Sequence, residues 1–182
     1  MNNQLKLAIN EHFHIRHTVP TDAEETFALI EKNRTYLRQW LPWVDATLTV
    51  ADCIENLEKL QEPNANPEFT LVFHDQIVGR LGFHEVDHTN RSASIGYWLA
   101  AEHQGHGLMT QAVQAALNHA FNTLNLHRIV IKAGVDNQSS RAVPERLGFH
   151  FEGIARDAEW LHDQFIDFAV YSMLSCEFSL AE

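Results

Sequence analysis

Two closely spaced glycines, Gly105 and Gly107, place the strongest constraint on how this chain can fold. They stand in the segment Gln104–Met109, after the apolar run Ser94–Leu99 and before a long amphipathic stretch. This order predicts a strand, a tight turn and a helix. Glycine lets the main chain approach a ligand without a Cβ in the way, and the helix directs its unpaired N–H groups and positive dipole end at the turn. The segment therefore predicts an anion-binding turn, with an ordinary strand-to-helix turn as the alternative.

Two familiar phosphate-binding motifs do not fit this turn. A P-loop carries Lys and then Ser or Thr after its last glycine, whereas Leu108 and Met109 follow here. The dinucleotide-binding pattern needs a third glycine within a parallel strand–helix–strand unit. Thr110 occupies that position, and the strand before the glycines follows two others in a predicted meander. The turn belongs to neither class.

The length of 182 residues predicts one domain over residues 1–182, large enough to bury a core without disulfides. Cys53 and Cys176 are too few for a disulfide framework, so a reducing cytoplasm is expected. The amino end, Met1–Ile9, lacks the apolar block of a signal peptide, and no segment has the apolar length of a membrane span. We therefore expect a cytoplasmic protein without a membrane partner.

The charge balance points away from nucleic acid. With 24 acidic and 13 basic residues, the net charge is -11, and nonspecific nucleic-acid binding needs a basic face. The charge weakly favours a cationic substrate, although solubility alone explains it as well. The 12 histidines lack a second Cys/His pair at zinc-closing spacing, so we expect no metal and interpret them as scattered surface or partly buried residues.

The predicted elements combine helices and strands in an α+β order. A capping box, Thr21 to Glu24, opens a helix that runs to about Lys32. Tyr36–Trp43 is expected to be a second short helix that Pro42 stops. Further helices are expected at Val50–Lys59, Gly107–Thr123 (with Val113, Leu117, Ala120, Phe121 and Leu124 on one apolar stripe) and Ser139–Leu147. Strands are expected at Phe13–His17, Glu68–Phe73, Ile77–Glu85, Ala93–Leu99, Arg128–Val135, Phe149–Ala155 and Phe165–Leu174.

Several motifs in this order resemble the GNAT superfamily of acetyl-CoA-dependent N-acetyltransferases. Gln104 and Gly107 match its phosphate loop, and Asn137–Ser140 followed by Leu147–Phe149 is similar to its second signature. Within the superfamily, the chain looks closest to the RimJ/RimL type of ribosomal-protein N-terminal acetyltransferases. The Tyr36–Trp43 segment, together with Glu152-Gly153 and Arg156, is typical of that branch.

The resemblance implies a GNAT fold: a mostly antiparallel mixed sheet of six to seven strands, flanked by helices, with splayed central strands. Acetyl-CoA would lie between the strand ending at Leu99 and the strand beginning near Arg128, with its pantetheine amides on a β-bulge at Tyr97–Leu99 and its diphosphate on main-chain N–H groups. The cofactor-binding residues would be Tyr97, Trp98, Leu99, Gln104, Gly105, His106, Gly107, Leu108, Met109, Thr110 and Asn137.

The resemblance also implies direct attack of an amine on the thioester, with no acyl-enzyme and so no nucleophilic role for either cysteine. Glu159 would be the base, because the RimL-like branch carries a Glu in this loop; a solvated loop carboxylate is the alternative interpretation. Glu85 ranks second as base and His84 third. Ser140 would stabilise the leaving thiolate from the first turn of its helix, the alternative being a hydroxyl bonded to backbone, and Asn137 would cap that helix.

The function that follows is acetylation of a primary amine, most directly the N-terminal α-amine of a protein, which can be ribosomal. The alternatives are a small amine acceptor (a polyamine, aminoglycoside or aminoacyl conjugate) and a non-catalytic CoA-binding module. Trp40 and Trp43 line the acceptor groove or pack between helices, and Pro144 predicts a kink near Ser140. The sequence leaves the oligomeric state open, a homodimer included.

Overall fold

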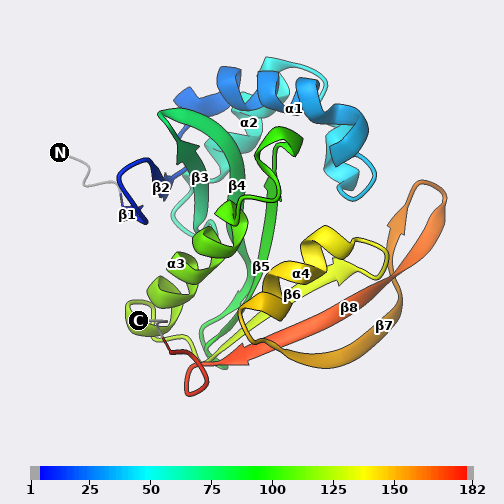
Figure 1. Cartoon of the computed structure of the whole chain (residues 1–182). Helices are drawn as coiled ribbons and strands as arrows, with labels where there is room; N and C mark the ends of the chain where they lie inside the picture. The colour runs from blue at the N-terminus through cyan, green and yellow to red at the C-terminus, as the bar shows by residue number, and fades with distance from the viewer. Residues whose placement is uncertain (1–4, 180–182) are drawn as a thin grey trace. The chain divides into compact units, whose positions relative to one another are not determined.

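The computed structural model describes residues 5–179, so Met1–Gln4, part of the amino end discussed above, lie outside the described residues. The chain forms two compact units. The first contains the described residues up to Gly82 together with Tyr97–Ala112, and the second contains Phe83–Gly96 and the described residues from Val113 onward. Strands β4 (Gln76–Asp87) and β5 (Ser92–Leu99) and helix α3 (Leu108–Asn122) pass from one unit into the other (Figure 1). The single domain over residues 1–182 stays a prediction.

The strands follow the order β1-β2-β3-β4-β5-β6-β8-β7, which is a mixed sheet and confirms the expected α+β class. Within residues 5–179 the sheet has eight strands, so the expected number of six to seven was wrong, because Lys6–Ala8 adds β1 at one edge, antiparallel to β2. Strands β5 and β6 (Arg128–Gly134) form a parallel pair over Ser92–Ser94 and Arg128–Val130 only. The two central strands are thus registered with each other only where they begin, as splayed strands require.

The first unit joins an antiparallel ladder to two helices. Its strands are β1, β2 (Phe13–His17), β3 (Glu68–Phe73) and the first part of β4, and its helices are α1 (Ala23–Leu37) and α2 (Val50–Lys59). Helix α2 begins where its sequence predicts, because the Thr49 hydroxyl accepts from the Asp52 N–H and the Asp52 carboxylate accepts from the Thr49 N–H. Ile30 and Leu37 of α1 pack in one core cluster with Val44 and Trp98.

The predicted capping box at Thr21 and Glu24 was wrong. A 3-10 helix, Pro20–Asp22, precedes α1, because proline suits the first turn of a helix. The Asp22 carboxylate accepts a bond from the Val19 N–H at 3.1 Å and two from the Arg16 guanidinium at 2.7 and 2.8 Å. The bonds from Arg16, six positions earlier in the sequence, lie outside the four-residue motif, and α1 begins at Ala23 with Asp22 instead of Thr21 as its N-cap.

The predicted separate helix over Tyr36–Trp43 was also wrong. Helix α1 continues through Leu37, and Pro42 begins a 3-10 helix, Pro42–Asp45, instead of stopping a helix. Proline is tolerated there because the first turn has no use for its missing N–H. The Trp43 ring, 37% exposed, lies 6.2 Å from the Trp98 ring. Neither proposed role of the tryptophans is tested by this contact.

The second unit consists of β6, α4 (Gln138–Arg146), β7 (His150–Leu161) and β8 (Gln164–Leu174), with the later part of α3 and parts of β4 and β5. Strand β8 pairs antiparallel with both β6 and β7, and β7 and β8 form a long hairpin (Figure 1). On α3, Val113, Leu117 and Ala120 are buried as predicted, but Leu124 is 40% exposed because the helix ends at Asn122.

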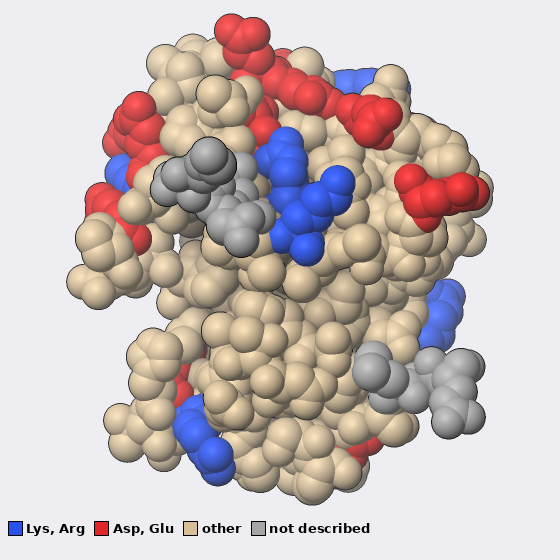
Figure 2. Space-filling view, turned by 90° about the vertical axis from the view of Figure 1, so that its left-hand side faces the viewer, with Lys and Arg blue, Asp and Glu red and all other residues tan. Residues whose placement is uncertain are grey.

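The surface charge reflects the composition. Acidic side chains form several separate groups on the face drawn in Figure 2, with basic side chains among them. Over residues 5–179, the structure contains no helix that is long and apolar enough to cross a membrane. The absence of nucleic-acid partners and the cytoplasmic location both stay predictions.

Candidate functional site

The predicted anion-binding turn has the backbone that its glycines suggest. Gly105 and Gly107 have φ values of +78° and +74°, and α3 begins directly afterwards at Leu108. L-residues rarely adopt such φ values, so the turn depends on glycine at both positions. A Cβ added at Gly105 would meet nothing within 4 Å, so open space lies beside the main chain there. This is a cradle that can admit a ligand to the main-chain N–H groups at the start of a fifteen-residue helix.

The side chains around the turn divide into those that anchor it and those at its surface. Leu108 and Met109 are buried, so their side chains fix the first turn of α3 in the core while their main chain remains at the helix start. His106, between the two glycines, is exposed, and Thr110 is half-buried. The side-chain amide of Gln104 donates to the Tyr36 hydroxyl. Contacts from α1 to this turn were not predicted, because their partners lie 68 positions apart in the sequence.

The end of β5 packs closely against β4 in the first unit. Trp98 and Leu99 are buried, and the Ala100 N–H donates to the Val78 carbonyl at 2.9 Å. A Cβ added at Gly79 would lie 2.3 Å from the Trp98 carbonyl oxygen, so the main chains of the two strands touch there. The β-bulge over Tyr97–Leu99 stays a prediction.

In the second unit, Asn137 caps α4 as predicted. Its side-chain oxygen accepts from the Ser140 N–H at 3.1 Å, which places the half-buried Ser140 in the first turn of that helix. The positive end of the helix dipole lies at this turn, so negative charge developing near the Ser140 hydroxyl would be stabilised. Pro144 lies inside α4, which runs from Gln138 to Arg146.

A buried tyrosine fastens α4 to the sheet. The Tyr171 hydroxyl, on β8, donates to the Glu145 carboxylate at 2.6 Å and accepts from Arg141 Nε at 2.9 Å. Arg141 also donates to the Val135 carbonyl at 2.9 Å. Sequence reasoning missed this network, since Tyr171 has no motif that links it to α4. The network fixes the helix that carries Ser140.

Glu159 lies in strand β7, so the prediction of a loop position was wrong. The strand was expected to end at Ala155, but a register shift between Ala155 and Glu159 lets pairing resume, with Glu159 opposite Ile166. The side chain is half-buried, and burial raises the pKa of its carboxyl above the ordinary range. A carboxylate in this state takes up a proton more readily than a solvated one.

Glu85, the second-ranked base, is engaged in an ion pair. Lys132 Nζ donates to its carboxylate at 2.9 and 3.2 Å, and this bond lowers the pKa of Glu85. The ring of His84, the third-ranked base, lies beside Gly96, where an added Cβ would come within 2.9 Å of Nε2. The two glutamates considered as the base, Glu85 and Glu159, thus differ in the direction of their pKa shifts.

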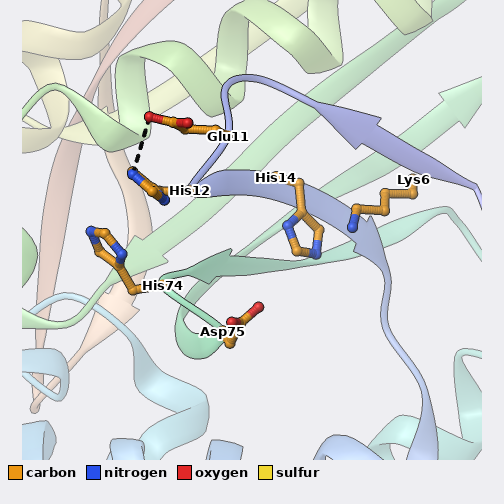
Figure 3. A pocket seen from close by; sticks show the side chains of 6 residues that line it. All are labelled: Lys6, Glu11, His12, His14, His74 and Asp75. Atoms are coloured by element: carbon orange, nitrogen blue, oxygen red, sulfur yellow. Dashed lines mark ion pairs between the residues drawn. The ribbon is translucent and has the colours of Figure 1, made fainter.

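A polar pocket of about 200 Å³ lies elsewhere, at the amino-terminal hairpin of the first unit (Figure 3). The His12 and His74 rings stack in it with centroids 4.5 Å apart, and burial, followed by the charges of Lys6 and Arg16, lowers the pKa of His14. The pocket is lined by Lys6, Glu11, His12, His14, His74 and Asp75. None of these is a predicted site residue. Within residues 5–179 no group of three or more His, Cys, Asp or Glu side chains could hold a metal ion.

The comparisons with known proteins agree with the resemblance that the motifs carry. The family model described as "Acetyltransferase (GNAT) domain" matches residues 12–150. "Putative ribosomal N-acetyltransferase YdaF" of Bacillus subtilis is 38% identical over 173 residues, which cover 93% of this chain and 94% of that protein. The ribosomal-protein-serine acetyltransferase of Escherichia coli is 31% identical over 171 residues, covering 92% of this chain and 96% of that protein.

A solved structure extends the similarity to three dimensions. The ribosomal alpha-N-protein acetyltransferase RimL, in complex with coenzyme A, superposes with a TM-score of 0.89 at 27% identity. The match covers 93% of this chain and 98% of that one.

Proposed function

Because the chain belongs to the GNAT family of acetyltransferases and is an N-acetyltransferase that uses acetyl-CoA, we propose that its acceptor is the N-terminal α-amine of a protein of the ribosomal type. The observation that carries this proposal is the similarity to two proteins named for ribosomal acetylation, over more than nine-tenths of the chain. The residue roles below belong to the same proposal.

The glycine turn is the proposed seat of the diphosphate of acetyl-CoA. The open space beside Gly105, the positive φ values and the start of α3 together fit an anion bound by main-chain N–H groups. Each charge-assisted bond contributes roughly 1.5–3 kcal/mol, so three or four suffice to hold the group. The main chain of Tyr97–Leu99 would bind the pantetheine amides, and Asn137 would contact the cofactor.

Glu159 is the proposed general base. Glu159 takes a proton from the α-ammonium group, directly or through one water, which leaves a neutral amine. The nitrogen lone pair then attacks the thioester carbonyl carbon, a C–N bond forms, the C–S bond breaks, and the second proton that the nitrogen loses goes to the leaving thiolate. The raised pKa of Glu159 suits this role, whereas Glu85 would have to give up its bond to Lys132 before accepting a proton. The thiolate that leaves would accept a hydrogen bond from the Ser140 hydroxyl, supported by the dipole of α4.

The protonation state of the acceptor favours an α-amine. An α-amine titrates near about 7.7–8.0, so forming the neutral nucleophile at pH 7 costs about 1.4 kcal/mol. A lysine amine near about 10.4 would cost about 4.6 kcal/mol. A single carboxylate meets the smaller requirement, which accords with one half-buried glutamate as the base.

The test measures acetyl transfer from acetyl-CoA to peptides with free and blocked N-termini and to a panel of small amines. We expect acetylation only of free peptide N-termini; turnover confined to polyamines, aminoglycosides or aminoacyl conjugates would assign the small-amine alternative. Tight CoA binding without turnover on any amine would assign a binding module.

The base is tested separately by Glu159→Gln, with Glu85→Gln as the matched control. We expect Glu159→Gln to lower kcat by at least about 100-fold at pH 7 with the KM for acetyl-CoA unchanged, since general bases contribute about 10²–10⁴-fold. The deficit should shrink at pH 9, where the α-amine is already neutral. A larger loss in Glu85→Gln than in Glu159→Gln would contradict the assignment.

A further inference from the structure

Side chains of helix α1 bond to the segment that leads into the glycine turn, and both the helix and this segment belong to the first unit. Asn33 Oδ1 accepts a hydrogen bond from the Ala101 N–H at 2.9 Å. Three residues further along the helix, the Tyr36 hydroxyl accepts from the side-chain amide of Gln104. Two side chains three residues apart, on one face of α1, therefore hold the two ends of the segment Ala101–Gln104.

The orientation of Asn33 is fixed by its own second bond. Its Nδ2 donates to the Leu29 carbonyl at 3.0 Å, one turn back on α1, so its oxygen must face Ala101. The residue is only 5% exposed, which excludes water as a ready substitute for either bond. Burial raises the pKa of Tyr36, whose hydroxyl therefore stays neutral at working pH.

The same helix is rigidly attached to the strand before the turn. Ile30 and Leu37, on either side of Asn33 and Tyr36, share a buried cluster with Trp98 of β5. The chain from Trp98 to Gln104 is thus held by apolar contacts at its start and afterwards by the bonds from Asn33 and Tyr36, with an exposed ion pair between Lys32 and Glu102 beside them. Gly105 follows at once, with its positive φ.

Anchoring matters for a turn of this kind because glycine is conformationally free. Main-chain N–H groups bind an anion together only if they point the same way before it arrives. If only a fraction of the molecules hold the competent turn, the apparent dissociation constant rises by the inverse of that fraction. Fixing the entry to the turn raises that fraction without any contact to the ligand.

We propose that Asn33 and Tyr36 are positioning residues for acetyl-CoA: by holding Ala101–Gln104, they preorganise the glycine turn for the diphosphate. This inference rests on the proposed role of the turn as the diphosphate seat. Neither side chain touches the cofactor, and both act on its affinity through the main chain. The contribution is to donor binding and not to the chemical step.

The test uses the full chain and measures CoA binding by calorimetry for Asn33→Leu and Asn33→Asp. Asn33→Leu removes the acceptor for the Ala101 N–H, and we expect CoA to bind about tenfold more weakly, which corresponds to about 1.4 kcal/mol. Asn33→Asp keeps an acceptor oxygen for the Ala101 N–H but loses the Nδ2–H that donates to the Leu29 carbonyl, so it should bind CoA more tightly than Asn33→Leu and more weakly than wild type. The matched control is Thr26→Val, two turns earlier on α1: Thr26 is 0% exposed, its hydroxyl has no hydrogen-bond partner within residues 5–179, and CoA affinity should not change.

A second readout separates positioning from general damage. S-acetylpantetheine carries the same acyl thioester as acetyl-CoA but no diphosphate. In Asn33→Leu, the KM for acetyl-CoA should rise about tenfold with kcat at saturation unchanged, while kcat/KM for S-acetylpantetheine stays at the wild-type value. Equal losses with both donors would show a merely structural role and overturn the inference.

The remaining outcomes are also decisive. A folded Asn33→Leu variant with wild-type CoA affinity overturns the inference and leaves the proposed function intact. If the wild-type protein does not bind CoA, the proposed function itself fails. Should Asn33→Leu not fold, Tyr36→Phe tests the same segment: it removes the acceptor for Gln104 and should weaken CoA binding about threefold without affecting S-acetylpantetheine.

Discussion

The ion pair between Arg128 and Glu152 makes a quantitative prediction about stability. Arg128 begins β6 and Glu152 lies on β7, with β8 between these strands in the sheet. Two bonds of 2.7 Å join the guanidinium to the carboxylate, and the Ser172 hydroxyl of β8 donates to the same carboxylate at 2.8 Å. The bonds from Arg128 are the main reason why the pKa of Glu152 falls from 4.5 to about 2. One side chain therefore connects three strands.

The magnitude follows from the pKa. Each pKa unit corresponds to about 1.4 kcal/mol, so the full difference would be about 3.4 kcal/mol. The two side chains are 34% and 33% exposed, and solvent screening reduces the expected contribution to about 1 kcal/mol. Because the folded-state pKa lies below the unfolded one, this stability is present above pH 4.5 and is lost as the pH falls towards 2.

The perturbation is Glu152→Gln, and the assay is urea unfolding at pH 7 and at pH 3. We expect the variant to be less stable than wild type by about 1 kcal/mol at pH 7 and by less than half of that at pH 3. At pH 3 the wild-type protein has already lost most of the stabilisation that the ionised Glu152 provides. Glu55→Gln breaks an exposed pair with Lys59 and serves as the control, with an expected change under about 0.5 kcal/mol. A Glu152→Gln deficit that is the same at both pH values would refute the electrostatic reasoning.

Two further substitutions test packing and the support of α4. Gly79→Ala should prevent folding or lower the free energy of unfolding in urea by more than about 3 kcal/mol, since its Cβ would lie 2.3 Å from the Trp98 carbonyl oxygen. The control, Gly96→Ala, should cost far less, because its Cβ would meet the movable end of the His84 side chain. Equal costs would contradict the close approach of the two main chains. Tyr171→Phe should destabilise the protein by about 1–2 kcal/mol by unfolding, because Glu145 and Arg141 each lose a partner; an unchanged midpoint would show that water replaces the hydroxyl.

Elements governed by local signals were predictable from the sequence. Helix α2 begins and ends at the predicted residues, since Thr49 and Asp52 form its cap within four positions. The start of α1 depends instead on Arg16, which reaches Asp22 from a neighbouring strand, and so the local motif at Thr21 misled. Pro42 is ambiguous by itself, because the same ring ends one helix and begins another.

The candidate site likewise combines a feature that the local sequence determines with contacts between residues far apart in the sequence. The tight turn at Gly105 and Gly107 depends on residues close together in the sequence, and the two glycines predicted it. The support from Asn33 and Tyr36 depends on contacts across 68 positions, and an asparagine or tyrosine on a helix carries no mark of such a partner. Short-range patterns could therefore locate the turn, whereas what holds it in place needed the fold.

The two glutamates proposed as bases show why residue type cannot rank them. Both are carboxylates with the same intrinsic pKa, and the difference arises from what surrounds each one. Lys132 stabilises the charged form of Glu85, so protonating that carboxylate costs the ion pair as well. Burial raises the pKa of Glu159, which makes proton uptake easier. The variant Lys132→Met removes the positive charge beside Glu85. If Glu159 is the base, the acid limb of the pH profile of kcat/KM should stay in place. If Glu85 is the base, that limb should move to higher pH, because the carboxyl of Glu85 would regain a higher pKa.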